Sequence, residues 1–163
     1  MKRGWILVVL MAFLAGCAQQ QEVIETVADD LETPVAAAPR QISVRLPEDT
    51  VVPVLENDQE QVYLCDEYEL ILQTVSSGDL DATVQTLTGC ARDRLTLVKT
   101  CQDDIDRYDF VWTSAGEKGD MLGRGVILDD GSYHYCMSVL RSADGTKKSR
   151  IVWSDVFGSF GLL

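Results

Sequence analysis

The segment that decides the predicted fold is Tyr133-His134-Tyr135-Cys136-Met137-Ser138-Val139-Leu140. Its odd-numbered side chains (two tyrosines, a methionine and a valine) would face one side of a sheet, and its even-numbered side chains the other. The preceding Asp129-Asp130-Gly131 is typical of a tight hairpin turn. We therefore expect residues 133–140 to form one strand of an antiparallel sheet.

The same period of two extends to both sides of this segment. Tyr108, Phe110 and Trp112 alternate, residues 114–119 read as a turn, and residues 122–128 are strand-like. After a turn at Asp144-Gly145, a last strand would carry Ile151, Trp153 and Phe157 on one face. Together these segments predict a C-terminal antiparallel β-meander of about four strands.

Upstream of Tyr108 the apolar spacing is that of helices. Three are expected, over residues 61–77, over residues 80–88 between an N-cap at Asp79 and a stop at Gly89, and over residues 91–107. A run of helices followed by a run of strands is typical of an α+β domain, here residues 61–163, with the helices packed on one face of the meander.

Four cysteines in this domain predict two disulfides, because an even number in a small exported domain indicates a disulfide framework. If Cys90 and Cys101 flank the third helix, they are roughly 16 Å apart, too far to pair. The expected pairs are Cys65–Cys90 and Cys101–Cys136. The cysteine spacings lack the close pairs of zinc sites, so no metal site is predicted.

No catalytic motif accompanies the chain's one histidine, His134, which would be a partly exposed strand residue. A catalytic triad assembled in three dimensions is the alternative. The aspartates at 103, 104, 106 and 109 are expected to be a solvated helix end rather than a cation site. We predict neither an enzyme nor a cofactor. A recognition surface is expected where aromatics lie on an uncovered sheet face, with the candidates Trp112, Tyr133, Tyr135, Trp153 and Phe160.

The N-terminus has the parts of an export signal. Lys2 and Arg3 precede an apolar run from Trp5 to Leu14, which is too short to span a bilayer comfortably. Leu14-Ala15-Gly16-Cys17 resembles the bacterial lipobox. The resemblance implies a signal peptide over residues 1–16, cleavage before Cys17, and lipidation (palmitate and diacylglyceryl) of its thiol. Because Ala18 is not aspartate, it implies anchoring to the outer membrane with the domain in the periplasm.

Residues 17–60 are expected to tether the domain to the membrane. Residues 18–60 hold ten acidic and two basic side chains, all four prolines and no glycine, a composition typical of an extended spacer. Within this segment, apolar and polar residues alternate over residues 42–46 as in a short strand. The alternative to a tether there is that these residues pair with a sheet edge of this chain or of a partner.

The net charge of the chain argues against one class of ligand. A net charge of −12 argues against nucleic acid as a ligand. We expect a non-catalytic envelope lipoprotein that binds a protein partner or acts as a structural or assembly factor. The alternative is a small disulfide-bonded inhibitor of an external hydrolase such as a lysozyme.

Overall fold

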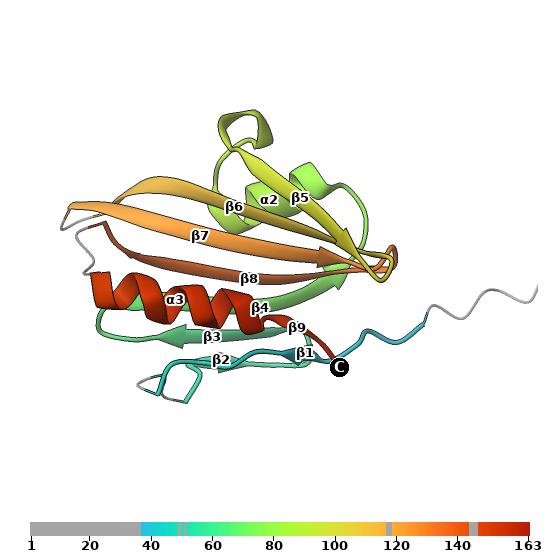
Figure 1. Ribbon diagram of the computed structural model, residues 1–163, viewed down its shortest axis with the longest axis horizontal. Helices are drawn as coiled ribbons and strands as arrows, with labels where there is room; N and C mark the ends of the chain where they lie inside the picture. The colour runs from blue at the N-terminus through green and yellow to red at the C-terminus, as the bar shows by residue number, and fades with distance from the viewer. Residues whose placement is uncertain (1–36, 49, 51, 117–118, 144–146) are drawn as a thin grey trace, which may run out of the picture. The chain divides into compact units, whose positions relative to one another are not determined.

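The computed structural model describes residues 37–163 except residues 49, 51, 117–118 and 144–146. The expected signal peptide, the lipidation site Cys17 and the first part of the expected tether lie outside the described residues. The described residues form a seven-stranded antiparallel sheet (Figure 1). From one edge to the other its strands are β2 (Leu55–Glu56), β3 (Glu60–Leu64), β4 (Tyr68–Ser76), β8 (Tyr133–Ser142), β7 (Gly119–Asp129), β6 (Ile105–Gly116) and β5 (Leu97–Gln102).

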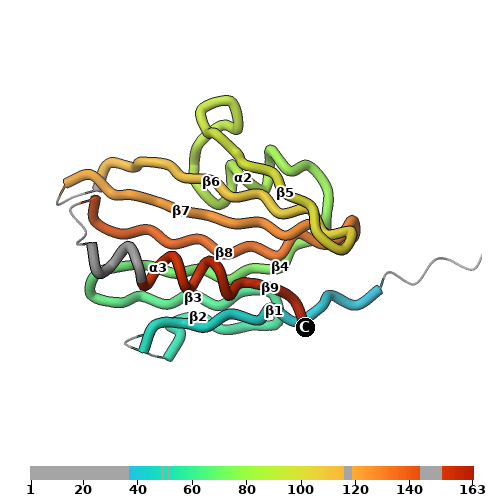
Figure 2. The backbone as a smooth tube through the Cα atoms, in the orientation of Figure 1, coloured from blue at the N-terminus to red at the C-terminus, as the bar shows by residue number. Residues whose placement is uncertain are grey.

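Two helices lie on opposite faces of this sheet. In Figure 1, α3 (Lys147–Ser159) lies in front of β4 and below β8 in the view, and α2 (Leu80–Thr88) lies behind β6. A 3-10 helix (Arg92–Arg94) follows α2. Outside the main sheet, β1 (Ile42–Ser43) pairs with β9 (Gly161–Leu162), so the beginning and the end of the described chain lie side by side (Figure 2).

Each face of the sheet has its own hydrophobic core. The core under α3 is the larger one and consists of Tyr63, Tyr68, Leu70, Leu72, Val126, Leu128, Tyr135, Met137, Val139, Trp153, Val156, Phe157 and Phe160. The core under α2 consists of Val84, Tyr108, Phe110, Trp112, Ile127 and Cys136. The odd and even side chains of β8 go to different cores, as its alternation predicted.

Two glycines make room for the aromatic rings on the α2 side. Gly123 and Gly125 on β7 are the register partners of Trp112 and Phe110 on β6. A Cβ atom on Gly123 would lie 2.0 Å from the indole, and one on Gly125 would lie 2.5 Å from the phenyl ring. Each ring therefore lies flat over a glycine, where any side chain would displace it.

The predicted hairpin between β7 and β8 is confirmed. Gly131 has φ of +87°, which glycine adopts without steric cost. The Asp130 carboxylate accepts hydrogen bonds from the backbone N–H groups of Ser132 (2.9 Å) and Tyr133 (2.8 Å) and from the Tyr135 hydroxyl (2.8 Å). Burial acts to raise the pKa of this carboxyl, but the hydrogen bonds outweigh burial and hold the pKa below its usual value.

The later part of the expected tether is ordered on the α3 side. The Arg40 N–H donates to the Tyr135 hydroxyl and the Arg45 N–H to the Ser159 hydroxyl, each over 2.9 Å. Ile42 and Val44 pack against the core under α3. Residues 42–46 were expected to be part of a tether or to pair with a sheet edge of this chain or of a partner. In the structure, Ile42 and Ser43 pair with β9 of the same chain.

The predicted α+β fold with three N-terminal helices is wrong, because the described chain is mostly β. Residues 61–77, expected to be a helix, form β3 and β4. Their apolar residues fit both periods, but the buried ones on β4 are Tyr68, Leu70 and Leu72, two residues apart. Pairing of β4 with β3 on one side and β8 on the other decides in favour of strands.

The expected third helix is also wrong. Residues 97–102 form β5, residues 105–116 form β6, and Asp103-Asp104 joins them in a tight turn in which both residues have positive φ. The helix expected over residues 80–88 is confirmed, with Asp79 as N-cap through its contact with the Asp81 N–H and Gly89 in the left-handed C-cap conformation.

The expected last strand is a helix. Residues 147–159 form α3, and its buried residues Trp153, Val156 and Phe157, followed by Phe160, recur at intervals of three and four. The prediction of a strand rested on Ile151, Trp153 and Phe157, a set that omits Val156, whose position only a helix places beside Trp153 and Phe160.

The expected disulfide staples are absent, and all four cysteines of the described domain are free thiols. Cys65 packs against the core under α3, whereas Cys90 packs against the core under α2, so the sheet separates them. Cys101 on β5 and Cys136 on β8 are three strand spacings apart, roughly 14 Å. The expected pairing assumed a helical hairpin that the chain does not form.

Candidate functional site

The five aromatic residues expected to form a recognition surface are divided between the two cores. Trp112 is buried under α2, and Tyr135, Trp153 and Phe160 are buried on the α3 side. Tyr133 is half-buried beside them. The structure therefore does not bring the five together on one exposed face. One of them, Trp153, lines an open groove.

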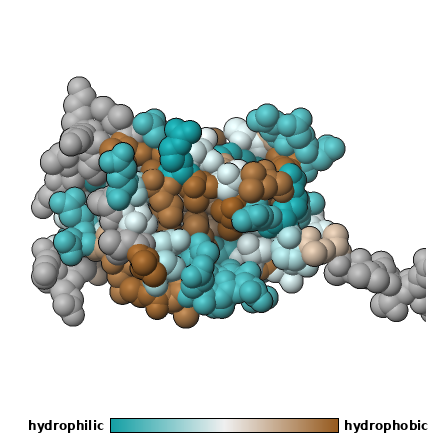
Figure 3. Space-filling view, turned by 90° about the horizontal axis from the view of Figure 1, so that it is seen from below, coloured by the Kyte–Doolittle hydropathy of each residue, from teal (hydrophilic) through white to brown (hydrophobic). Residues whose placement is uncertain are grey.

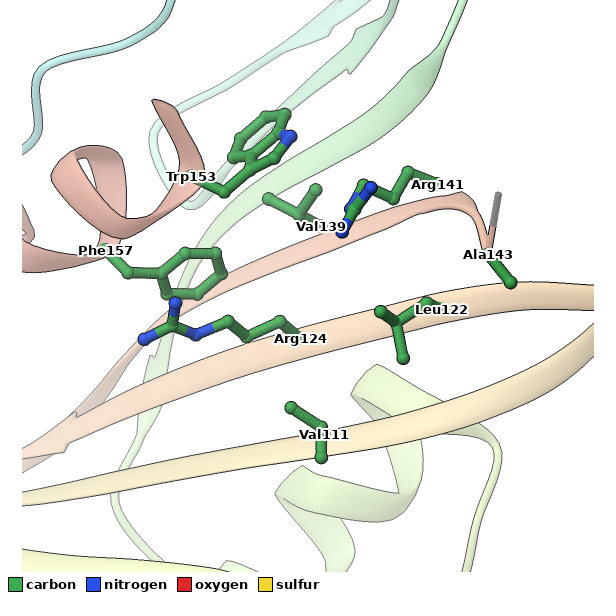
Figure 4. A pocket seen from close by; sticks show the side chains of 8 residues that line it. All are labelled: Val111, Leu122, Arg124, Val139, Arg141, Ala143, Trp153 and Phe157. Atoms are coloured by element: carbon green, nitrogen blue, oxygen red, sulfur yellow. The ribbon is translucent and has the colours of Figure 1, made fainter. Parts of the chain in front are cut away.

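This groove, called here the α3 groove, lies between α3 and strands β6, β7 and β8. It has a cavity volume of about 280 Å³. Figure 4 shows its walls: the rings of Trp153 and Phe157 from α3 lie above residues of three neighbouring strands. The lining residues are Val111, Leu122, Arg124, Val139, Arg141, Ala143, Trp153 and Phe157.

The register of β6, β7 and β8 produces this composition. Val111, Arg124 and Val139 form one row across the sheet, and Leu122 and Arg141 are neighbours in the next row. On β7 and β8 an arginine therefore stands two residues from an apolar residue of the same face. The result is a floor in which two guanidinium groups alternate with aliphatic side chains.

Arg124 is held in place by two contacts. Its guanidinium carbon lies 4.1 Å from the centre of the Phe157 ring, within cation–π range. One of its nitrogens lies 3.7 Å from the Asp109 carboxylate. Asp109 binds Arg107 more closely, with nitrogen–oxygen distances of 2.7 and 3.3 Å, so it offsets the charge of Arg124 only in part.

Arg107 also fixes the position of α3 against the sheet. Its guanidinium donates to the backbone carbonyls of Phe157 (2.9 Å) and Phe160 (3.3 Å), at the C-terminal end of α3 where the helix dipole favours a cation. Because Phe157 also lines the α3 groove, Arg107 helps to hold this wall of the groove against the sheet.

The polar side-chain groups of the groove are hydrogen-bond donors. Arg124, Arg141 and the Trp153 indole N–H donate, and the other lining side chains are apolar. Among the described residues, the lining contains no carboxylate, imidazole, thiol or hydroxyl, the groups that serve as nucleophiles or general bases.

His134 has a hydroxyl and a carboxylate beside it but is enclosed. The Thr83 hydroxyl lies 2.8 Å from Nδ1, and an Asp129 oxygen lies 3.6 Å from Nε2. The ring is only 1% exposed, in contrast to the expected partly exposed residue. Asp129 also accepts from the Gly131 N–H at 2.8 Å. This arrangement joins α2 to the sheet, and neither described pocket contains it.

The expected acidic cluster is dispersed along a hairpin. Asp103 and Asp104 form its turn, Asp106 pairs with Lys99 at 2.6 Å, and Asp109 pairs with Arg107. The hydrogen bond from Lys99 holds the pKa of Asp106 below its usual value. Among the described residues no group of three or more histidine, cysteine or acidic side chains is placed to hold a metal ion.

Two further surfaces lie apart from the α3 groove. A polar pocket of about 190 Å³ lies between residues 40–42, residues 57–61 and β4. Exposed apolar side chains gather near β2, where Val52, Val54 and Leu55 are exposed. In Figure 3, which views the molecule from the side of β1 and β2, apolar surface lies between hydrophilic patches. Neither surface combines apolar strand residues with two arginine side chains as the α3 groove does.

Sequence reasoning did not find Arg124 and Arg141. The signal was present as a charged residue on the otherwise apolar face of a buried strand, in Leu122-x-Arg124-x-Val126 and in Met137-x-Val139-x-Arg141. Arg141 lies near the end of β8, whereas Arg124 lies at the middle of β7. Only the pairing of β7 with β8 shows that the two are neighbours on one face.

Comparison with known proteins gives no family for this chain. No protein-family model matches it, and no curated protein matches it. In the part of the chain that the structure describes, no helix has the length and apolar character needed to span a bilayer. The functional assignment therefore depends on the sequence and on the geometry of the α3 groove.

Proposed function

We propose that this chain is a membrane-anchored envelope lipoprotein that binds a protein partner through the α3 groove and has no catalytic activity of its own. Lipidated Cys17 would hold it on the outer membrane with its folded part in the periplasm. The observation that carries the proposal is an open, partly apolar groove that combines aromatic, aliphatic and arginine side chains.

The apolar part of the groove supports a protein partner. Val111 on the rim is 55% exposed, and Leu122 and Trp153 lie in the same groove. Aromatic and arginine side chains are the residues most enriched at the energetic centres of protein interfaces. The described residues of the lining include no acid–base or nucleophilic group, which favours binding over catalysis.

Site-specific photocrosslinking in intact cells tests this proposal. A photoreactive phenylalanine analogue is placed at Val111, and as a control at Leu64, which is 54% exposed on β3 and faces the opposite side of the sheet. We expect one reproducible protein adduct from position 111 and none from position 64. Mass spectrometry of the adduct identifies the partner.

Three other outcomes are informative. An adduct from both positions, or from neither, contradicts binding at the α3 groove. An adduct with a secreted hydrolase whose activity falls on addition of the chain would favour the inhibitor over the structural or assembly factor. Turnover of a substrate by the chain alone would contradict a non-catalytic role.

A further inference from the structure

We propose that the sheet face opposite α3 binds a soluble cationic amphipathic peptide at β2, β3 and β4. This surface is separate from the α3 groove, because it lies on the other side of the sheet. Two properties carry the inference: aliphatic side chains that neither helix covers, and acidic side chains around them in a long stretch of sequence without a basic residue.

The uncovered aliphatic side chains follow from the alternation of the strands. On β3 and β4, Tyr63, Leu70 and Leu72 belong to the core under α3, so the residues between them face the other side of the sheet. Strand β2 continues this other face, because its residues pair with those of β3. The apolar residues on it, called here the β3 strip, are Leu55, Val62, Leu64 and Ile71.

Neither helix covers the β3 strip. The core under α2 contains residues of β6, β7 and β8 and none of β2, β3 or β4. In Figure 1, α2 lies behind β6, whereas β2 and β3 lie in the lower half of the view. Leu55 is 46% exposed and Leu64 is 54% exposed, and Val62 and Ile71 are half-buried between neighbouring strands. Within the described residues, the strip therefore belongs to neither hydrophobic core.

Acidic side chains surround the β3 strip. Glu60 and Glu69 lie on the same face near its two ends, and Asp66 and Glu67 are exposed in the turn between β3 and β4. In the part of the chain that the structure describes, Glu60 and Glu69 form no ion pair. Residues 46–91 contain ten acidic side chains and no lysine or arginine. Charge complementarity therefore favours a cationic ligand.

Charge disfavours three other occupants of this face. Residues 18–36 carry five acidic and no basic side chains, so folding them back onto the strip would bring like charges together. A second copy docked through the same face would place Glu60 and Glu69 against the same acids of its partner. A membrane surface with anionic lipids would be repelled for the same reason.

The size of the face favours a short peptide over a folded protein. Three strand axes span roughly 10 Å, and the five residues of β3 span roughly 16 Å. A stable protein interface needs about 800 Å² from each partner, several times this footprint. One helix, with a diameter of about 10–12 Å, would cover the strip with its apolar side and place its lysines or arginines beside the acids.

Fluorescence anisotropy with the full-length chain in dodecyl maltoside micelles tests the inference. The probes are three labelled peptides of about 14 residues, long enough as helices to span the strip. One has lysine and leucine in helical amphipathic order, one has glutamate in place of lysine, and one has glutamine in place of leucine. After subtraction of the signal from empty micelles, we expect saturable binding of the lysine–leucine peptide with Kd below about 0.1 mM, and binding at least about tenfold weaker for the other two.

Variants on each face assign the binding. Leu64→Lys and Leu64→Glu remove the same exposed side chain and differ in charge, so Leu64→Lys should bind the lysine–leucine peptide about fivefold more weakly than Leu64→Glu. Glu69→Gln should weaken binding and reduce its dependence on salt. Asp93→Asn, in the exposed 3-10 helix, and Val111→Gln, in the α3 groove, should leave it unchanged. Unfolding curves establish that each variant is folded.

Photocrosslinking of the purified chain locates the peptide. A photoreactive analogue at Leu64 should link the lysine–leucine peptide, and one at Val111 should not, because the two positions lie on opposite faces. Cells grown without such a peptide leave this face empty, so the in-cell experiment still expects no adduct at position 64. A cellular partner linked at position 111, with no peptide linked at position 64, would contradict this inference and leave the proposed function intact.

Several results would overturn the inference. They are equal binding of the lysine and glutamate peptides, equal binding of the peptide without leucine, no saturable binding beyond that of empty micelles, or equal effects of Leu64→Lys and Leu64→Glu. A resident protein linked at position 64 in cells would overturn the soluble peptide as the occupant of this face.

Discussion

Gly123→Ala tests whether the core under α2 depends on an aromatic ring lying flat on bare backbone. The added Cβ atom would lie 2.0 Å from Trp112 Cε2 and within 2.4 Å of two more atoms of the indole. Ordinary contact begins near 3.4 Å, so the ring has to move by about 1.4 Å. Trp112 is 7% exposed in the packed core under α2, which resists that movement.

The magnitude follows from this geometry. Overpacking a well-filled core costs about 1–3 kcal/mol, and a rigid ring displaced by more than an ångström belongs at the upper end. At roughly 4 °C per kcal/mol for an ordered unit of this size, Gly123→Ala should lower Tm by about 10 °C. Gly125→Ala should cost less, because its Cβ atom would lie 2.5 Å from the Phe110 ring rather than 2.0 Å.

Thermal unfolding followed by circular dichroism measures the effect. Gly78→Ala is the matched control, because nothing lies within 4 Å of its Cβ position and its φ is not positive. In the double variant Gly123→Ala with Trp112→Leu, the alanine methyl should partly fill the space left by the indole. The two changes should then cost about 1 kcal/mol less together than the sum of their separate costs. A Tm for Gly123→Ala within about 1 °C of that of Gly78→Ala would refute the reasoning.

Three further predictions concern other parts of the molecule. Arg107→Gln should lower the free energy of unfolding by about 2 kcal/mol, measured in urea, because it removes the contacts to the end of α3; an unchanged urea midpoint would show that α3 docks without them. Asp130→Asn should destabilise the protein at pH 7 and make its stability less dependent on acid pH. A carboxyl whose pKa is depressed in the folded state stabilises the protein above its unfolded pKa of about 3.9, and this effect is lost as pH falls through the folded pKa. A stability that falls with acid pH in the variant as it does in the parent chain would contradict this. Under native conditions at pH 8, iodoacetamide should label exposed Cys101 but not buried Cys136, because burial raises the pKa of the Cys136 thiol to about 12. In denaturant both thiols should be labelled. Peptides joined by disulfides would contradict the free thiols.

The parts of the fold that the sequence predicted correctly are those with local signals. The helix over residues 80–88 was marked by an N-cap aspartate and a C-cap glycine, and both act as expected. The hairpin at residues 129–131 was marked by its Asp-Asp-Gly turn. The alternation over residues 133–140 specified both the strand and the two faces of its side chains. In each of these segments the residues that decide the conformation lie within a few positions of one another.

The errors arose where a short apolar run satisfies two periods. In residues 61–77, Leu64, Tyr68, Ile71 and Val75 fit a helical face, whereas Tyr68, Leu70 and Leu72 fit a strand. Intrinsic preference is too weak to choose between these spacings, and burial against β3 and β8 makes the choice. The same holds for residues 147–159, where packing of Trp153 and Phe157 on the sheet selects a helix.

The α3 groove could not be predicted from the sequence for a related reason. Arg124 and Arg141 are 17 positions apart in the chain and become neighbours only through the pairing of β7 with β8. The sequence by itself determined the charge, one helix and the central hairpin, because these follow from composition or from adjacent residues. Tertiary structure alone decided the seven-stranded sheet, the separation of the cysteines and the groove. Each of these depends on which strands pair, and long-range burial rather than local preference selects that pairing.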